Sequence, residues 1–72
     1  MKPTVLIVDD SLTVRMDLYE AFAADGFSCT LCATGAEART AFAAQHFDAA
    51  VLDVVLPDSD GVQLLRELRA QP

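Results

Sequence analysis

Hydrophobic residues along the chain gather in three short runs separated by longer segments of mixed polarity. The runs cover residues 4–9, 27–33 and 49–53, and they are rich in the β-branched, aromatic and aliphatic side chains that favour strands. The first and third runs are almost continuously apolar, which is typical of strands covered on both faces in a parallel sheet. We therefore predict three strands, with the weakest pattern in residues 27–33 because serine and cysteine interrupt it.

The segments between the runs have apolar residues at helical spacing. The first predicted helix covers residues 12–25, can be capped by Asp10 or Ser11, and stops at Gly26. Its apolar residues at helical spacing are Val14, Leu18, Ala21 and Phe22.

Two further helices follow the second and third runs. Thr34 and Glu37 have the spacing of a capping box, so the second helix should begin there and extend to about residue 45. Its predicted inner face is Ala38, Ala41 and Phe42. The third helix follows a turn-rich segment, residues 56–61, and its predicted buried stripe is Val62, Leu65 and Leu68.

The resulting order is βαβαβα within one domain over residues 1–72. The connections are too short for anything other than right-handed crossovers between parallel strands, so the pattern predicts the α/β class. No linker, low-complexity segment or second domain is apparent in the sequence.

Composition narrows the possible partners. Hydrophobic residues make up 53% of the 72 residues, which excludes the composition of a disordered chain. The net charge of −6 repels nucleic-acid backbones and anionic lipid, so we expect no direct binding to nucleic acid or membrane. The apolar run near the N-terminus is too short for a signal peptide or a membrane span, and we expect a cytoplasmic location.

Cys29 and Cys32 have the C-x-x-C spacing of some redox pairs and zinc sites. On a strand, however, side chains three residues apart point to opposite faces, and no second Cys/His pair is present to complete a zinc site. We therefore predict two reduced, packed cysteines.

The residues best suited to chemistry are acids at the ends of two predicted strands. Asp9 and Asp10 end the first predicted strand, and Asp53 ends the third. Ligands of open parallel sheets bind beyond the carboxyl ends of the strands, so these carboxylates would converge if the two strands are neighbours. Three adjacent carboxylates repel one another unless a cation is supplied, and Mg²⁺ prefers such oxygen ligands. One acid could then attack a phosphoryl donor while the others hold the metal.

Two motifs around these acids resemble the signatures of response-regulator receiver domains, the CheY-like family. They are Val-Asp-Asp-Ser at residues 8–11 and Val-Leu-Asp-Val-Val-Leu-Pro-Asp-Ser-Asp-Gly at residues 51–61. The resemblance runs along the whole chain and implies a flavodoxin-like α/β fold with a three-stranded parallel sheet in the order 2-1-3 and three helices. It also implies a role in two-component signal transduction, with a histidine kinase or phosphotransfer protein as the phosphoryl donor.

The resemblance assigns a role to each site residue. Asp53 corresponds to the phosphoacceptor, Asp10 to a direct Mg²⁺ ligand, and Asp9 to a ligand mainly through water. Val55 corresponds to the residue whose main-chain carbonyl binds the metal. No other cofactor is expected.

A complete receiver has five β-α units, with a Ser or Thr hydroxyl ending the fourth strand and a Lys ending the fifth. This chain ends at Pro72, so the resemblance covers the first three units. We do not expect an enzyme beyond Mg²⁺-assisted autophosphorylation, and we do not expect efficient phosphotransfer by this polypeptide alone. The third strand would have an open edge, and we expect a homodimer through that edge to complete the sheet.

A structural role remains the alternative, in which a half-receiver self-associates without phosphotransfer. A flavodoxin would need a hydroxyl- and glycine-rich phosphate loop where Asp9 and Asp10 stand, and a haloacid-dehalogenase-type phosphatase would need Asp-x-Asp there. Both enzyme classes are therefore disfavoured.

Other polar residues receive structural interpretations. We interpret Asp58 and Asp60 as turn and cap residues, and His46 as an exposed residue past the end of the second helix. Three arginines are expected to be solvated on polar helix faces: Arg15, Arg66 and Arg69.

Overall fold

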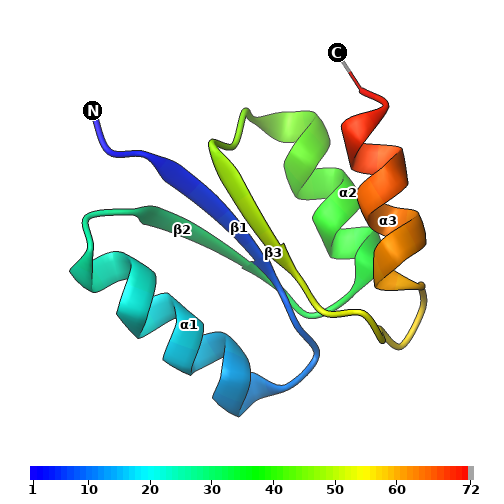
Figure 1. Ribbon diagram of the computed structural model, residues 1–72, viewed down its shortest axis with the longest axis horizontal. Helices are drawn as coiled ribbons and strands as arrows, with labels where there is room; N and C mark the ends of the chain where they lie inside the picture. Colours follow the sequence, from blue (N-terminus) through cyan, green and yellow to red (C-terminus); the bar gives the residue numbers. More distant parts are fainter. Residues whose placement is uncertain (72) are drawn as a thin grey trace.

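The computed structural model describes residues 1–71. Three parallel strands form one sheet in the order β2-β1-β3, with α1 on one face and α2 and α3 on the other (Figure 1). In chain order the elements are β1 (Thr4–Val8), α1 (Leu12–Ala24), β2 (Ser28–Cys32), α2 (Gly35–Ala44), β3 (Ala49–Leu52) and α3 (Gly61–Arg69). The predicted α/β class, parallel sheet and strand order are confirmed, whereas no dimer is described and dimerisation stays a prediction.

β1 is the central strand and is buried on both faces. Its residues Val5, Leu6, Ile7 and Val8 are all 0% exposed. Because side chains alternate along a strand, Leu6 and Val8 face α2 and α3, while Val5 and Ile7 face α1. This burial explains why the first run of the sequence is continuously apolar.

The hydrophobic core lies mainly between the sheet and the α2/α3 layer. Its buried members come from β1, the end of β2, α2, the segment after β3, and α3. They are Leu6, Val8, Cys32, Ala38, Leu56, Leu64 and Leu68. The partly buried residues Ala41, Phe42, Phe47 and Leu52 pack against them. The predicted inner face of the second helix is therefore confirmed.

Local capping explains where α1 and α2 begin. The Ser11 hydroxyl accepts a hydrogen bond from the Val14 N–H at 3.3 Å, and the Thr34 hydroxyl accepts one from the Glu37 N–H at 3.1 Å. The Glu37 carboxylate accepts from the N–H of Ala33, the residue before the cap, at 3.2 Å. Each cap satisfies donors that the first helical turn leaves free.

The predicted buried stripe of the third helix is wrong in two of its three residues. Val62 and Leu65 are 45% and 39% exposed, whereas Leu64 and Leu68 are buried. Residues 62, 65 and 68 follow one another at intervals of three, which is shorter than the helical period of about 3.6, so they do not stay on one face. Leu64 and Leu68 are four residues apart and lie on the same face. Gly61 is the third buried residue of the helix.

The inner face of α1 is narrower than predicted. Leu18 and Phe22 are half-buried, but Val14 and Ala21 are exposed, and the helix has no fully buried residue. Phe22 packs edge to face on Phe27, with ring centroids 5.2 Å apart. α1 therefore covers the sheet with one row of side chains.

The two cysteines are free, as predicted. Cys29 is half-buried and Cys32 is buried, and burial raises the pKa of the Cys32 thiol above its usual value. Within residues 1–71, no helix has both the length and the apolar character needed to cross a membrane.

Gly61 is required by a close approach of two backbone segments. A Cβ at this position would overlap the carbonyl oxygen of Asp53 and lie 2.8 Å from the Cα of Val54. The Gly61 N–H donates to the Val54 carbonyl at 2.8 Å. Gly26 differs, because a Cβ there meets open space and only its φ of 89° disfavours other residues.

We expect Gly61→Ala to lower the free energy of unfolding by about 1–3 kcal/mol, because backbone must move to admit the methyl group. Urea unfolding followed by circular dichroism measures this. Gly26→Ala is the control, because an added Cβ there meets open space and the only strain comes from the positive φ of that residue. Only Gly61→Ala should shift the amide NMR resonances of Asp53 and Val54, and unchanged resonances there would contradict the close approach.

Candidate functional site

Asp9 and Asp53 lie side by side because the hydrogen bonding of β1 continues one residue past the strand ends. The Asp9 N–H donates to the Cys32 carbonyl at 3.0 Å, and the Asp53 N–H donates to the Val8 carbonyl at 2.8 Å. Backbone pairing therefore places both residues at the carboxyl edge of the sheet, and Asp10 follows directly in the turn before α1.

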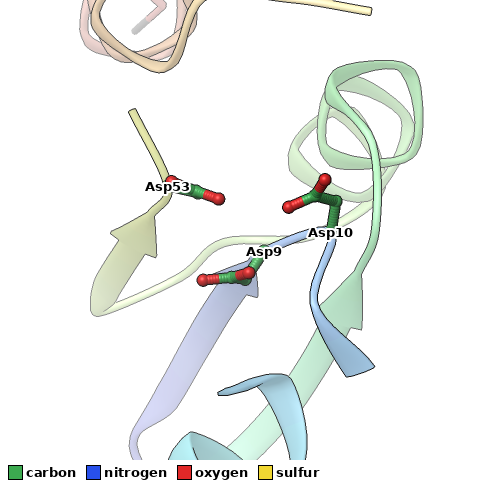
Figure 2. A group of neighbouring side chains, drawn as sticks. All are labelled: Asp9, Asp10 and Asp53. Atoms are coloured by element: carbon green, nitrogen blue, oxygen red, sulfur yellow. The ribbon is translucent and has the colours of Figure 1, made fainter. Parts of the chain in front are cut away.

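Asp9, Asp10 and Asp53 form one acidic cluster (Figure 2). One carboxylate oxygen from each residue lies within 4.8 Å of the others. Asp9 and Asp53 are half-buried and Asp10 is exposed. The structure thus brings together the three acids that the sequence analysis predicted to converge.

Two of the three carboxylates are oriented by neighbouring backbone donors. Asp9 Oδ1 accepts a hydrogen bond from the Ser11 N–H at 2.9 Å, and Asp53 Oδ1 accepts one from the Val55 N–H at 3.3 Å. Such bonds limit the rotamers that each acid can adopt before any ligand arrives. Asp10 has no such side-chain bond to any residue within 1–71.

The chemistry of the cluster fits a hard divalent cation. Within residues 1–71, none of the three carboxylates forms an ion pair, so no direct ion-pair partner offsets their mutual repulsion. Mg²⁺ prefers oxygen ligands at 2.0–2.1 Å, and opposite ligands then lie about 4.2 Å apart. The 4.8 Å spread is compatible with some oxygens binding directly and others through water.

The cluster lies apart from the two hollows found elsewhere on the molecule. A hollow of about 350 Å³ lies at the other end of the sheet, lined in part by Phe42, His46 and Phe47. A second hollow lies beside β2 and α2. Neither hollow is lined by an acid of the cluster. Solvent reaches the cluster, since Asp10 is exposed and Asp9 and Asp53 are half-buried.

Asp58 and Asp60, in the segment after β3, are cap residues as predicted. Asp60 Oδ1 accepts from the Val62 N–H at 2.8 Å and caps its own helix, α3. Asp58 caps α2 instead, accepting from the N–H groups of Gly35 at 2.7 Å and Ala36 at 2.9 Å. Asp58 therefore ties the segment that follows Asp53 to a helix more than twenty residues earlier.

These bonds change the acidity of Asp58. The hydrogen bond from the Gly35 N–H, followed by that from Ala36, holds the pKa of the Asp58 carboxyl below its ordinary value. Negative charge at a helix N-terminus is favourable because the first N–H groups have no helical partner.

Arg15 is not solvated as expected from the sequence. It is half-buried, and its Nη1 donates to the main-chain carbonyl of Asp9 at 2.9 Å. The sequence does contain a signal for this contact, since Arg15 lies one turn after the cap Ser11 and helical side chains lean toward the N-terminus. Arg66 and Arg69 are exposed in the last turn of α3, as expected.

The expected metal role of the Val55 carbonyl stays a prediction. Val55 is 74% exposed and pairs with Asp60 in an isolated antiparallel bridge. This bridge forms a small closed loop, which the Leu56 N–H supports by donating to the Ser59 carbonyl at 3.1 Å. The backbone that carries Val55 is therefore ordered next to the cluster.

Comparison with known proteins agrees with the geometry. The family model described as response regulator receiver domain matches residues 5–72. The chain is 39% identical to Response regulator MprA of Mycobacterium bovis over 70 residues, which are 97% of this chain and 30% of that protein. It is 38% identical to Transcriptional activator protein PfeR of Pseudomonas aeruginosa over 69 residues, which are 96% of this chain and 23% of that protein.

Solved structures show the same arrangement of elements. The chain matches the response regulator receiver domain (CheY-like) from Methylobacillus flagellatus with a TM-score of 0.94 and 30% identity, covering 100% of this chain and 61% of that one. It matches the chemotaxis response regulator CheY4 of Vibrio cholerae with a TM-score of 0.94 and 28% identity, covering 99% and 59%. The chain therefore spans less than two thirds of the proteins it matches.

We expect Asp58→Ala to lower the melting temperature by a few degrees, because two N–H groups of α2 lose their acceptor. The difference from the unsubstituted protein should be fully present above the ordinary pKa of 3.8. It should shrink as the pH falls through the lower, folded-state pKa, where the carboxyl becomes protonated. Thermal melts between pH 7 and strongly acidic conditions measure this, and a difference that grows on acidification would contradict the cap.

Proposed function

The chain belongs to the response regulator receiver domain family, and on that premise we propose that Asp53 accepts a phosphoryl group in Mg²⁺-dependent two-component signalling. The observation that carries the proposal is the convergence of three carboxylates without an ion-pair partner within residues 1–71. Such a cluster is costly unless a cation binds it, which supports a metal-dependent role.

The three acids would have different roles in this reaction. Asp9 and Asp10, with Asp53 and the main-chain carbonyl of Val55, would hold Mg²⁺. When bound, the ion neutralises negative charge on the phosphoryl oxygens. A carboxylate oxygen of Asp53 forms the new bond to phosphorus, the bond to the donor's leaving group breaks, and that group takes the electron pair. The hydrogen bond from the Val55 N–H to Oδ1 limits the orientation of the Asp53 carboxylate.

The donor in this proposal is a histidine kinase or phosphotransfer protein. The position of the acids at the sheet edge suits transfer from another macromolecule, because Asp10 is exposed and Asp9 and Asp53 are only half-buried. The only lysine, Lys2, precedes β1 and so lies at the opposite end of the sheet from the acids. We therefore propose that the chain alone is phosphorylated slowly and is no enzyme beyond this reaction.

Incubation with Mg²⁺ and an acyl phosphate should add one phosphoryl group to the chain, detected as a mass gain in intact-protein mass spectrometry. Asp53→Ala should abolish the gain, and so should removal of Mg²⁺ with a chelator. The adduct should be lost in mild base, as expected for an acyl phosphate on a carboxylate.

Asp17→Asn is the matched control, because it removes an exposed acid on α1 that is outside the cluster. It should be phosphorylated like the unsubstituted chain. A folded, unsubstituted chain that gains no phosphoryl group, even after long incubation, would contradict the proposed acceptor role of Asp53 and favour the structural alternative.

We also propose that this chain self-associates through β3. In residues 1–71 β3 pairs with β1 alone, so its other edge has free main-chain groups. Its residues Ala49 and Ala50 are exposed, and the strand contains no charge or proline that would discourage pairing. Pairing of two such edges across a two-fold axis would extend the sheet.

Light scattering during size-exclusion chromatography should give the mass of two chains at micromolar concentration. Ala50→Lys should shift the chain toward the monomer, because a charge on the edge opposes pairing. Ala24→Lys is the matched control, since Ala24 is exposed at the end of α1, away from β3. A monomer with a cooperative melt in the unsubstituted chain would exclude this dimer.

A further inference from the structure

We infer that Arg15 is a positioning residue for Asp10, an acid that the cluster itself leaves without a side-chain hydrogen bond. This inference rests on the proposed Mg²⁺ site. Asp9 and Asp53 are each oriented by a backbone N–H, from Ser11 and Val55. The exposed Asp10 has no such bond within residues 1–71, so its direction depends on the backbone that carries it.

Arg15 contacts that backbone directly. Its Nη1 donates to the Asp9 carbonyl oxygen at 2.9 Å, and this carbonyl belongs to the peptide unit that links Asp9 to Asp10. Because a peptide unit is planar, holding the carbonyl oxygen also holds the N and Cα of the next residue. The guanidinium therefore limits how far the Cα of Asp10, from which the carboxylate extends, can move away from Asp9 and Asp53.

The backbone on either side of the Asp9–Asp10 peptide is held by other hydrogen bonds. The Asp9 N–H is bonded to the Cys32 carbonyl, which fixes the plane before Asp9, and the N-cap at Ser11 fixes the start of α1. The Asp9–Asp10 peptide lies between these two points. Arg15 is the side chain that secures it among the hydrogen bonds of residues 1–71.

The charge of Arg15 and its contact with the Asp9 carbonyl predict opposite effects of its removal on Mg²⁺ binding. A cation held at the acid-bearing turn repels a second cation, so removing only its charge should tighten Mg²⁺ binding. Loss of the contact should weaken binding, because Asp10 must then be ordered by the metal itself. The partial burial of Arg15 and its anchored head favour the positional effect.

Mg²⁺ titrations followed by amide NMR shifts test this in the full chain. Groups that orient metal ligands typically contribute 10–100-fold to affinity, and since Arg15 acts through the backbone we expect Arg15→Ala to raise the Kd about tenfold. Arg15→Lys keeps the charge but loses the planar donor group, and it should raise the Kd less. Arg66→Ala, an exposed arginine in α3, is the charge-matched control and should leave the Kd unchanged.

A double-mutant cycle separates positioning from general destabilisation. In an Asp10→Asn background, Arg15→Ala should change the Kd less than about twofold, because the ligand it positions is gone. Far-UV circular dichroism establishes that each variant is folded at the titration temperature. An equal effect in both backgrounds, or tighter binding by Arg15→Ala alone, would overturn the inference. Absence of Mg²⁺ binding by the unsubstituted chain would overturn the metal site itself.

Discussion

Parallel pairing of β1 with β3 is the constraint on which the site depends. The register sets Val8 beside Leu52, so the residue that follows each strand is delivered to the same edge of the sheet. Both following residues are aspartates, and their N–H groups still find main-chain acceptors. A shift of the register by one residue would also exchange the faces of β3 and separate the acids. The apolar burial that fixes the register therefore also fixes the site.

The segment between β3 and α3 performs several structural tasks next to the acids. Leu56 is buried in the core, Asp58 caps α2, Asp60 caps α3, and Gly61 lies against the backbone of Asp53. Each contact uses a residue type that few others can replace: an aliphatic anchor, two short acceptors, and a residue without Cβ. The acidic residues of this region thus have two different roles, because Asp58 and Asp60 bond to helix termini while Asp53 faces the cluster.

Much of this arrangement could be predicted from the sequence because it follows from local chemistry and from topology. The strand runs, the cap at Thr34 and the convergence of Asp9 with Asp53 needed only periodicity and the rule that parallel strands end at one edge. The buried face of α3 was predictable in part, because Leu64 and Leu68 are four residues apart and stay on one face of a helix. The close approach of Gly61 to Asp53, at the start of that face, is a tertiary contact without a periodic signal.

Hydrogen bonds from side chains to backbone groups were also hard to predict from local sequence patterns. Asp58 looks like an ordinary turn residue, and only the folded chain brings it to the N-terminus of α2. For Arg15 the only signal is its position one turn after Ser11, because its partner is a carbonyl group, which every residue carries. Caps and turns have short sequence signatures, but a hydrogen bond from a side chain to a distant backbone group has none.

The acid cluster joins the two layers that cover the sheet. Arg15 and the Asp9–Asp10 turn connect it to α1, which has no buried residue of its own. Asp53 and the following loop connect it to α2 and α3, where most of the core lies. A cation that binds only the folded chain stabilises it in proportion to the logarithm of its concentration relative to the Kd. Because Asp9 and Asp10 precede α1 while Asp53 follows β3, such a cation would link the weakly packed α1 layer to the rest of the fold.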